Sequence, residues 1–426
     1  MTDKSQQVPA VVDKQERRLD RLLRKQILKR LQQLPEGRIH LLEDGEVTTF
    51  GQATGQTDLE VRISVLHPAF YRALGFGGSN GAAEAYMDGY WECDDLTKLI
   101  RIMARNRQVM DTLEGGSAWI VNQMNKGWHW FNRNTADGSR RNIAAHYDLG
   151  NQLFERVLDD TMMYSCAVFE QPEDDLARAS RNKLDRICRK LQLHPGDNVI
   201  EIGTGWGGFA LHAAEHFGCH VTTTTISQEQ YDYTKQRVAA RGLQDRITLL
   251  LKDYRELSGQ FDKLVSIEMV EAVGHQFLNT YVNKCSSLLK PDGMLLLQSI
   301  TIDDQRYKHA VNEVDFIKRY IFPGSFIPSV TTICTAATQA SDLKLTDMED
   351  IGLHYVKTLQ HWRERFHLHL PELEQLGYDR QFQRMWDFYL AYCEGGFAER
   401  AISDVQLLFT KPRCQSWSSP ARVLPI

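Results

Sequence analysis

The sequence lacks the features that would mark a membrane-spanning or secreted protein. The 426-residue chain has no apolar secretory segment at its start and no run of about 18 apolar residues. Its eight cysteines are scattered and include no Cys-x-x-Cys pair, which argues against both a zinc site and a disulfide framework. We therefore expect a cytoplasmic protein with reduced thiols, in which any membrane contact is peripheral.

An excess of charge of one sign is also missing. The net charge is −5 with 25% charged residues, so the composition gives no general attraction to nucleic acid, and we expect no nucleic-acid partner. The hydrophobic content of 42% is typical of globular proteins. A chain of this length is too long for one ordinary core, so we expect two or three domains.

The first part of the chain predicts a small α+β domain. Residues 1–12 are polar and expected to be disordered, and residues 14–34 predict a helix with one apolar and one basic face. Such a helix can lie on an anionic membrane, although a solvated face on a packed helix explains the pattern equally well. Short strands are expected over 38–66, and a glycine-rich break over 75–81 is expected between helical patterns, with a further helix over 95–113.

A polar stretch at 132–140 predicts a linker, and it follows an aromatic segment at 119–131. We therefore expect an N-terminal lipid- or membrane-binding domain over 1–131 and a second domain over 141–426. In the second domain, short apolar runs alternate with helical patterns, which predicts a doubly wound Rossmann-like α/β sheet. The expected strands span 197–202, 219–224, 246–251, 261–267 and 294–298, a turn at 290–293 precedes the fifth, and a last antiparallel strand is expected over 405–410.

The strongest local motif is a glycine turn between a strand and a helix, Val199-Ile-Glu-Ile-Gly-Thr-Gly-Trp-Gly-Gly-Phe209. Glycines let the backbone approach a ligand, and the helix N-terminus offers unpaired N–H groups. A NAD site has an acidic residue about 20 positions farther on, but residues 219–228 contain none. Glu201, just before the glycines, can instead face a cation. This combination favours S-adenosylmethionine and a class I methyltransferase sheet.

Ligands of such sheets bind at the carboxyl ends of the strands. The residues that follow the expected strands include Asp253 and Tyr254, which suit an adenine ring, and two glutamates, Glu268 and Glu271. Pairing with a helix dipole explains such glutamates equally well.

Several longer motifs resemble the cyclopropane fatty acid synthase family, in order and over roughly residues 35–410. They are Glu84-Ala-Tyr-Met-Asp-Gly-Tyr-Trp91, Ala145-His-Tyr-Asp-Leu-Gly-Asn151, Met163-Tyr-Ser-Cys-Ala167, Glu201-Ile-Gly-Thr-Gly-Trp-Gly-Gly208, Thr225-Ile-Ser-Gln-Glu-Gln230, Glu268-Met-Val-Glu-Ala-Val-Gly274 and Tyr320-Ile-Phe-Pro323. The resemblance implies an enzyme that moves a methylene from S-adenosylmethionine onto a cis double bond of an unsaturated phospholipid at the membrane surface, on its inner face. A carbocation forms in the chain, and a bound bicarbonate ion removes a proton so that the ring closes.

The resemblance also implies roles for individual residues. The bicarbonate would be held by Cys166, Glu271, Gln298, Ile300 and Tyr355; Cys166 and Ile300 would contribute backbone groups, Glu271 would accept the bicarbonate hydroxyl, and Tyr355 would donate from its phenol. The cofactor would contact Tyr164, Gly203, Gly205, Ile226, Gln230, Asp253 and Tyr254. The excursion at 301–350 would roof the acyl pocket.

Gln298 departs from the pattern, because many family members have His at this position. A Gln amide donates a hydrogen bond but cannot take up a proton. A methyl-branched or methylene product therefore stays open as an alternative to the ring. A small-molecule amine methyltransferase and a lipid-binding protein without activity are further alternatives, and the oligomeric state, including a homodimer, is left open.

Overall fold

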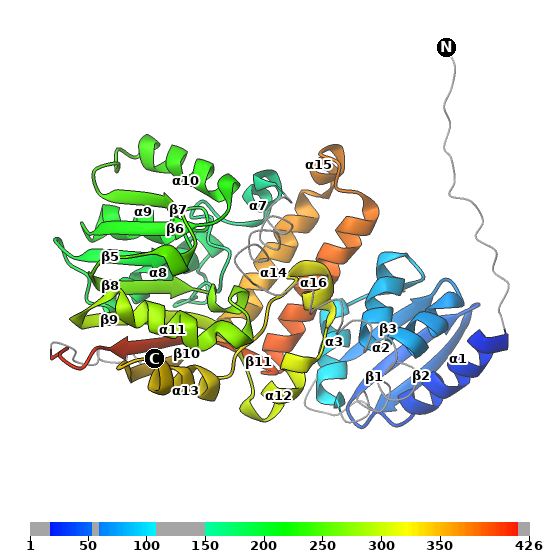
Figure 1. The fold of residues 1–426 in the computed structure, drawn as a ribbon. Helices are drawn as coiled ribbons and strands as arrows, with labels where there is room; N and C mark the ends of the chain where they lie inside the picture. The colour runs from blue at the N-terminus through cyan, green and yellow to red at the C-terminus, as the bar shows by residue number, and fades with distance from the viewer. Residues whose placement is uncertain (1–17, 53–58, 108–149, 416–426) are drawn as a thin grey trace, which may run out of the picture. The chain divides into compact units, whose positions relative to one another are not determined.

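The structure is a computed structural model, and it describes residues 18–52, 59–107 and 150–415 (Figure 1). The chain divides into two compact units, Met1–Val121 and Asn122–Ile426. The segment 1–12, the aromatic segment 119–131 and the linker 132–140 lie outside the described residues, so the predicted domain limits stay predictions. None of the helices in the described ranges is long and apolar enough to cross a membrane.

The N-terminal unit contains a four-stranded sheet in the order β2-β1-β3-β4. Strand β1 runs antiparallel to β2 and parallel to β3. Alternate residues of β1, Ile39 and Leu41, are buried, as expected for a strand with one face on a core. The elements are α1 (Arg18–Leu31), β1 (Gly37–Glu43), β2 (Glu46–Gln52), β3 (Glu60–Val65), α2 (Ala69–Met87), β4 (Trp91–Cys93) and α3 (Leu96–Arg105).

The glycine-rich break predicted at 75–81 is confirmed, because two helical stretches meet within α2 at a kink at Gly78. Gly78 has φ 56° and ψ −136°, a conformation that residues with a Cβ rarely adopt. A Cβ on Gly81 would overlap the carbonyl oxygen of Ala73. The glycines therefore allow a sharp bend between the two helical stretches of α2 and the close approach of Gly81 to Ala73.

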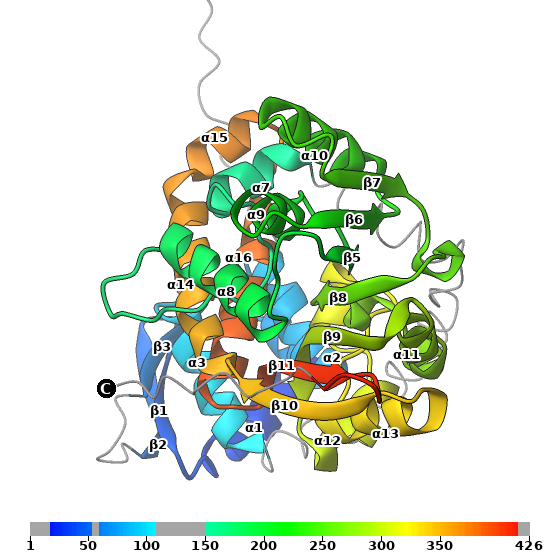
Figure 2. The same ribbon diagram turned by 90° about the vertical axis from the view of Figure 1, so that its left-hand side faces the viewer.

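The C-terminal unit contains a seven-stranded sheet in the order β10-β11-β9-β8-β5-β6-β7. Figure 2 shows these strands one above another, from β10 at the bottom to β7 at the top. Strands β5 to β9 are parallel, while β11 runs antiparallel to β9 and β10 antiparallel to β11. This order confirms the predicted doubly wound sheet. The strands are β5 (Asn198–Ile202), β6 (His220–Thr225), β7 (Ile247–Leu251), β8 (Phe261–Ile267), β9 (Leu289–Ile302), β10 (Lys344–Asp350) and β11 (Ile402–Thr410).

Both faces of this sheet are buried. Val199 and Val265 enter one core, while their neighbours Ile200 and Leu264 enter the other. Helices α8 and α9 lie on one face, and α11 and α13 lie on the other (Figure 2). Burial on two faces explains why the strands read as continuous apolar runs. The helices are α7 (Asn151–Val157), α8 (Leu176–Lys190), α9 (Gly208–His216), α10 (Gln228–Ala240), α11 (Leu278–Ser287), α12 (Asp304–Asn312), α13 (Val330–Ala340), α14 (Gly352–Leu368), α15 (Leu370–Gln375) and α16 (Arg380–Ala398).

The segment after the fifth strand differs from the prediction. The excursion at 301–350 contains α12, a π-helix at Ile317–Ile321, α13 and the edge strand β10. The turn predicted at 290–293 is a bulge within β9, because Phe261 pairs with Leu289 while Lys263 pairs with Met294. Beyond β10, helices α14 and α16 pack against each other. They bring aromatic side chains toward the site described next.

Candidate active site

The glycine loop leaves β5 in backbone conformations that favour glycine. Gly203 and Gly205 have φ of 101° and 52°. The backbone N–H groups of Gly203 and Thr204 both donate to the carbonyl oxygen of Thr224, at 3.1 and 3.0 Å, which ties the loop to the end of β6. Among the described residues, leaving out Gly205 and its two chain neighbours, no atom lies within 4 Å of the place where a Cβ on Gly205 would be. The loop is therefore open at this point, where a ligand can approach the backbone.

Glu201 lies on β5 directly before this loop and is buried. One carboxylate oxygen accepts a hydrogen bond from the Thr223 hydroxyl at 2.6 Å. Burial raises the pKa of Glu201 to about 8. A cation bound beside the carboxylate would favour its ionised form and lower this pKa, which fits the predicted sulfonium ligand.

The other predicted cofactor residues lie where β6 and β7 end. Ile226 follows β6, and Ser227 caps α10 as predicted by accepting from the backbone N–H of Gln230 at 3.3 Å. The Gln230 side-chain oxygen accepts from the Thr225 hydroxyl at 2.8 Å, which leaves its amide nitrogen as the donor for a ligand.

Asp253 and Tyr254 follow β7. Both carboxylate oxygens of Asp253 accept from the Arg255 guanidinium, at 2.8 and 2.7 Å, so this side chain is already paired. The Tyr254 ring meets the Tyr281 ring edge-on, with centroids 5.2 Å apart. Its half-buried face is the better candidate for stacking on an adenine ring.

The centre of the site is a buried carboxylate, Glu268, directly after β8. Its Oε1 accepts from the backbone N–H of Cys166 at 2.8 Å and from the Gln298 amide at 3.0 Å. Its Oε2 accepts from the Tyr355 hydroxyl at 2.7 Å. We call these three donors the carboxylate cradle. Glu268 has φ 48°, a left-handed conformation that costs energy for a residue with a side chain and is common at functional sites.

The orientation of the Gln298 amide is fixed by a chain of hydrogen bonds. Lys190 can only donate, and it donates to Oε1 of Gln406 at 2.8 Å. The Gln406 amide must then donate to Oε1 of Gln298, at 3.1 Å. The Gln298 nitrogen therefore faces Glu268 and also donates to Asp404 at 2.8 Å.

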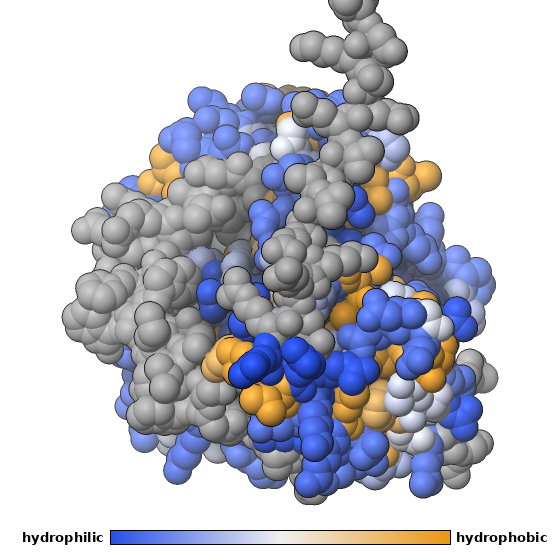
Figure 3. Space-filling view, turned by 90° about the vertical axis from the view of Figure 1, so that its right-hand side faces the viewer, coloured by the Kyte–Doolittle hydropathy of each residue, from blue (hydrophilic) through white to orange (hydrophobic). Residues whose placement is uncertain are grey.

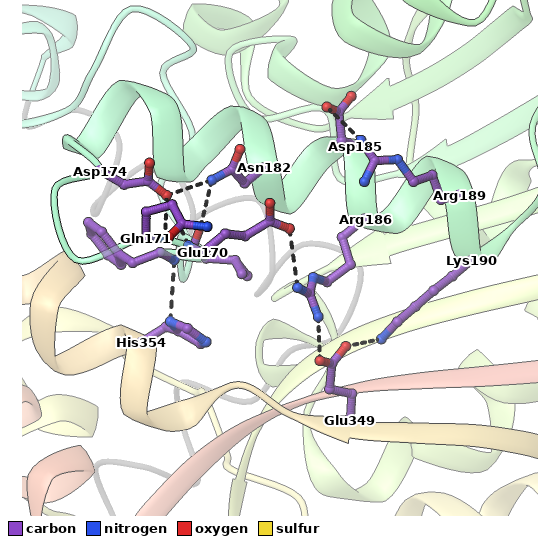
Figure 4. A network of polar contacts seen from close by, with 12 residues as sticks. Glu170, Gln171, Asp174, Asn182, Asp185, Arg186, Arg189, Lys190, Glu349 and His354 are labelled. Carbon is purple, nitrogen blue, oxygen red and sulfur yellow. Dashed lines mark hydrogen bonds and ion pairs between the residues drawn. The ribbon is translucent and has the colours of Figure 1, made fainter. Parts of the chain in front are cut away.

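Lys190 itself is held in place by a polar network between α8 and β10. Its ammonium pairs with Glu349 at 2.7 Å, and Arg186 bridges Glu349 to Glu170 (Figure 4). In the same network, His354 of α14 accepts from the backbone N–H of Phe169 at 3.3 Å. The network thus fixes the end of α8 and the start of α14, which carries Tyr355.

Asp404, on β11, is a second fully buried carboxyl group beside Glu268. Burial, followed by the neighbouring Glu268, raises the pKa of Asp404 well above its usual value. Two carboxylates this close in a dry interior do not both ionise. Because Glu268 receives three hydrogen bonds and Asp404 one, Asp404 holds the proton and Glu268 carries the charge.

Glu271 lies one turn after Glu268 and has a different set of partners. Its Oε1 accepts from the backbone N–H of Ile300 at 2.6 Å and from the Ser299 hydroxyl at 3.0 Å. Its Oε2 is buried without a hydrogen-bond partner among the described residues. Burial raises the pKa of Glu271 to about 8, so its neutral form persists through neutral pH.

The Cys166 thiol points away from the carboxylates, toward the carbonyl oxygens of Ala167 and Ile351. Burial raises the pKa of this thiol well above its usual value, so it is not a ready nucleophile. Only the backbone N–H of Cys166 belongs to the cradle.

An aromatic wall lies beside the cradle. The Tyr355 ring meets the Trp362 ring edge-on at 5.9 Å between centroids, and Trp362 lies 5.1 Å from Tyr164. The Tyr164 hydroxyl in turn contacts that of Tyr389 at 2.8 Å. The site therefore combines a buried carboxylate with several aromatic faces, an arrangement that can stabilise a cation.

The predicted bicarbonate does not fit these contacts. The cradle predicted for it has Cys166, Gln298 and Tyr355 as donors, and all three already donate to Glu268. The backbone N–H of Ile300, also assigned to bicarbonate, donates to Glu271. An anion placed among these donors would have to displace the Glu268 carboxylate and lie close to its negative charge.

Two important residues were not assigned roles from the sequence. Glu268 was noted as one of two carboxyls after a strand, yet no motif indicated that it would lie inside the cradle. Asp404 lies one residue before the strand predicted over 405–410, and the observed strand β11 includes it. Its alternation with Gln406 beside Val405 and Leu407 is the signal of polar side chains on one face of that strand.

The sequence matches a family model described as "Mycolic acid cyclopropane synthetase" over residues 134–407. The chain is 38% identical over 359 residues to tuberculostearic acid methyltransferase UfaA1 of Mycobacterium tuberculosis, which covers 82% of this chain and 83% of that protein. It is also 38% identical to the cyclopropane-fatty-acyl-phospholipid synthase of Escherichia coli, over 82% of this chain and 87% of that protein.

Among solved structures, a similar one is mycolic acid cyclopropane synthase CmaA1 complexed with SAH and CTAB. It has a TM-score of 0.60 and 29% sequence identity, and the match covers 64% of this chain and 98% of that one.

Proposed function

Because this chain belongs to the mycolic acid cyclopropane synthetase family of S-adenosylmethionine-dependent methyltransferases, we propose that it acts on the acyl chain of an unsaturated phospholipid. The methyl carbon of the cofactor is transferred to a cis double bond, and the product is a cyclopropane ring. The observation that carries this proposal is the buried carboxylate of Glu268, held beside an aromatic wall at the carboxyl ends of the strands.

The site suits the chemistry of an alkene. An alkene is a weak nucleophile, so the sulfonium methyl must be held close and in line with it. Methyl transfer leaves a carbocation in the chain, which water would capture unless the site is dry. Aromatic faces such as those of Tyr164 and Trp362 lower the energy of a nearby cation, and Trp362 is almost fully buried.

The cofactor supplies the methyl group, and the chain supplies its binding site. In this proposal the glycine loop and Glu201 hold the charged part of S-adenosylmethionine, Gln230 donates from its free amide nitrogen, and Tyr254 stacks on the adenine.

The substrate would be reached at a membrane surface through helix α1. Leu19 and Leu22 of this helix are 42% and 62% exposed, and exposed basic residues lie among them. Figure 3 shows small hydrophobic areas between strongly hydrophilic ones on this side of the molecule. Apolar side chains flanked by positive charge are typical of helices that bind anionic bilayers.

A second candidate product is a methyl-branched or methylene chain. It is favoured by the similarity to a relative named as a tuberculostearic acid methyltransferase. The methylene product needs the same methyl transfer and the same loss of one proton as the ring, so these two differ only in which bond the released electron pair forms. A saturated methyl branch needs a reductant in addition.

The proposal is tested by incubating the protein with S-adenosylmethionine labelled in its methyl group and vesicles of unsaturated phospholipid. Label is expected in the lipid, and chromatography separates cyclic from branched acyl chains. Cofactor binding without any label in the lipid would rule the proposal out, and transfer of label to added amines would favour the amine methyltransferase instead.

A further inference from the structure

We infer that the chain supplies its own proton acceptor for this reaction, the Glu268 carboxylate, in place of a bound bicarbonate ion. The inference rests on the proposed function and identifies a catalytic residue within the same site. The geometric basis is that Cys166, Gln298 and Tyr355, the donors expected to hold the bicarbonate, all donate to the Glu268 carboxylate.

Glu268 has the shape and the charge that the cradle requires. A carboxylate and a bicarbonate ion both present two oxygens on a planar carbon and accept the same donors. Oε1 of Glu268 accepts two hydrogen bonds, from Cys166 and Gln298, while Oε2 accepts one, from Tyr355. Oε2 therefore keeps the capacity to accept a further hydrogen.

The surroundings keep Glu268 ionised although it is fully buried. Burial raises the pKa of Glu268, whereas the hydrogen bonds from Tyr355 and Cys166 and the buried ammonium of Lys183 act to lower it, and the neighbouring Asp404 holds the shared proton. Lys183 is fixed by donating to the Ser165 hydroxyl at 2.7 Å. A negative charge is thus available before the substrate arrives.

The backbone holds Glu268 in this position at a cost. Its φ of 48° lies in the left-handed region, which favours glycine. Its backbone N–H donates to the carbonyl oxygen of Gln298 at 2.9 Å and locks β8 to β9 at this point. Strain that persists at a buried carboxylate indicates that the position of the side chain is used.

The step balances without any further reactant. A C–H bond of the transferred methyl group breaks, and its electron pair forms the last bond of the ring or, in the branched product, a double bond. The proton goes to Oε2 of Glu268, which becomes a carboxylic acid and later returns the proton to water. The sulfonium has become a thioether, so the positive charge of the cofactor leaves as this proton.

The test measures label transfer to unsaturated phospholipid vesicles in buffer stripped of carbon dioxide, with and without added bicarbonate. The wild-type rate is expected to stay within about twofold, since the base is built in. Glu268→Gln should lose about 10²- to 10⁴-fold, the range for loss of a general base, and should still bind S-adenosylmethionine.

Glu268→Gly removes the carboxylate, relieves the backbone strain and leaves the cradle empty. Its activity should be low and should rise when formate or bicarbonate is added, because either anion can then occupy the three donors. Glu215→Gln is the matched control, since Glu215 pairs with Arg241 at 2.8 Å on the surface, and its rate should not change.

A wild-type enzyme that needs added bicarbonate would overturn the inference, as would a Glu268→Gln enzyme with an unchanged rate. The bicarbonate dependence of the wild-type enzyme is measured without any variant, so it tests the inference even if a Glu268 variant fails to fold. A wild-type enzyme that labels no lipid under either condition would instead overturn the proposed function.

Discussion

At the scale of single residues, the site is defined by ionisable groups that share one buried cluster. Lys183, Glu268, Glu271 and Asp404 are all shielded from solvent. Burying a charge is costly unless it is paired or hydrogen-bonded. The cluster limits this cost by protonating Asp404 and Glu271 and by surrounding the remaining carboxylate with donors. Such a distribution of protons is typical of a site that moves protons.

Tyr355→Phe tests the link between the cradle and proton transfer. Burial raises the pKa of Glu268, and the Tyr355 hydroxyl opposes this shift by donating to the carboxylate, so its removal should raise that pKa further. The base then stays protonated up to a higher pH, and the acidic limb of the pH–rate profile should move upward, with about a tenfold lower rate near neutrality. A lower rate with an unmoved limb would mean that Tyr355 only packs against its neighbours.

Glu201 predicts a pH dependence of cofactor binding. Burial raises its pKa to about 8, so the free enzyme holds this proton below pH 8 and a cationic ligand must release it. Affinity for S-adenosylmethionine should therefore rise with pH up to about 8 and then level off. Calorimetry in two buffers of different ionisation enthalpy should detect the released proton, and Glu201→Gln should abolish both effects; affinity that is flat with pH in the wild type would exclude this role.

At the scale of elements, the glycines of helix α2 differ in how much the fold requires them. Gly78 and Gly81 of α2 permit the kink and the close approach to Ala73, whereas a Cβ on Gly77 would meet nothing within 4 Å. Gly78→Ala should therefore destabilise the protein by about 1–3 kcal/mol, whereas Gly77→Ala should be neutral or stabilising by up to about 1 kcal/mol. Denaturant unfolding of both variants gives the comparison, and equal losses would contradict the kink as the cause.

The same elements show what the sequence could predict. Strands β5 to β8 were predicted within a residue or so, because apolar runs followed by polar or glycine residues are a local signal. Strand β10 was missed because it lies at a sheet edge, where most of its residues are exposed or half-buried and show no strict alternation. The break predicted at 75–81 is present as the kink at Gly78 in α2, because clustered glycines are a local signal of a non-helical backbone.

At the scale of the whole molecule, the site depends on contacts between distant parts of the sequence. Glu268 receives hydrogen bonds from residues 102, 30 and 87 positions away along the chain. The glycine loop could be identified from one continuous motif, and the family resemblance placed Cys166, Gln298 and Tyr355 in one site. Neither the motif nor the resemblance could reveal that the Glu268 side chain lies between these three residues and accepts their hydrogen bonds. That position depends on how distant parts of the chain pack in the folded protein.

The N-terminal unit predicts how the protein meets its substrate. Reversing the charge of Arg18, Arg21, Lys25 and Lys29 on α1 should weaken binding to anionic phospholipid vesicles by about tenfold or more, since each basic residue near the surface contributes about 1 kcal/mol. The loss should be larger at low salt. Reversing Lys235 on α10 and Arg241 directly after it is the control. Equal binding by both variants and the wild type in a sedimentation assay would mean that the basic face of α1 is only solvated and does not bind the membrane.

The proposed reaction is tested most directly by how many hydrogen atoms the transferred methyl group keeps in the product. The direct measurement uses S-adenosylmethionine with a fully deuterated methyl group, unsaturated phospholipid vesicles and mass spectrometry of the acyl chains. Loss of one methyl proton to a base predicts lipid that carries two of the three deuterium atoms. Lipid that retains all three, or lipid without any deuterium beside a methylated amine, would contradict the account.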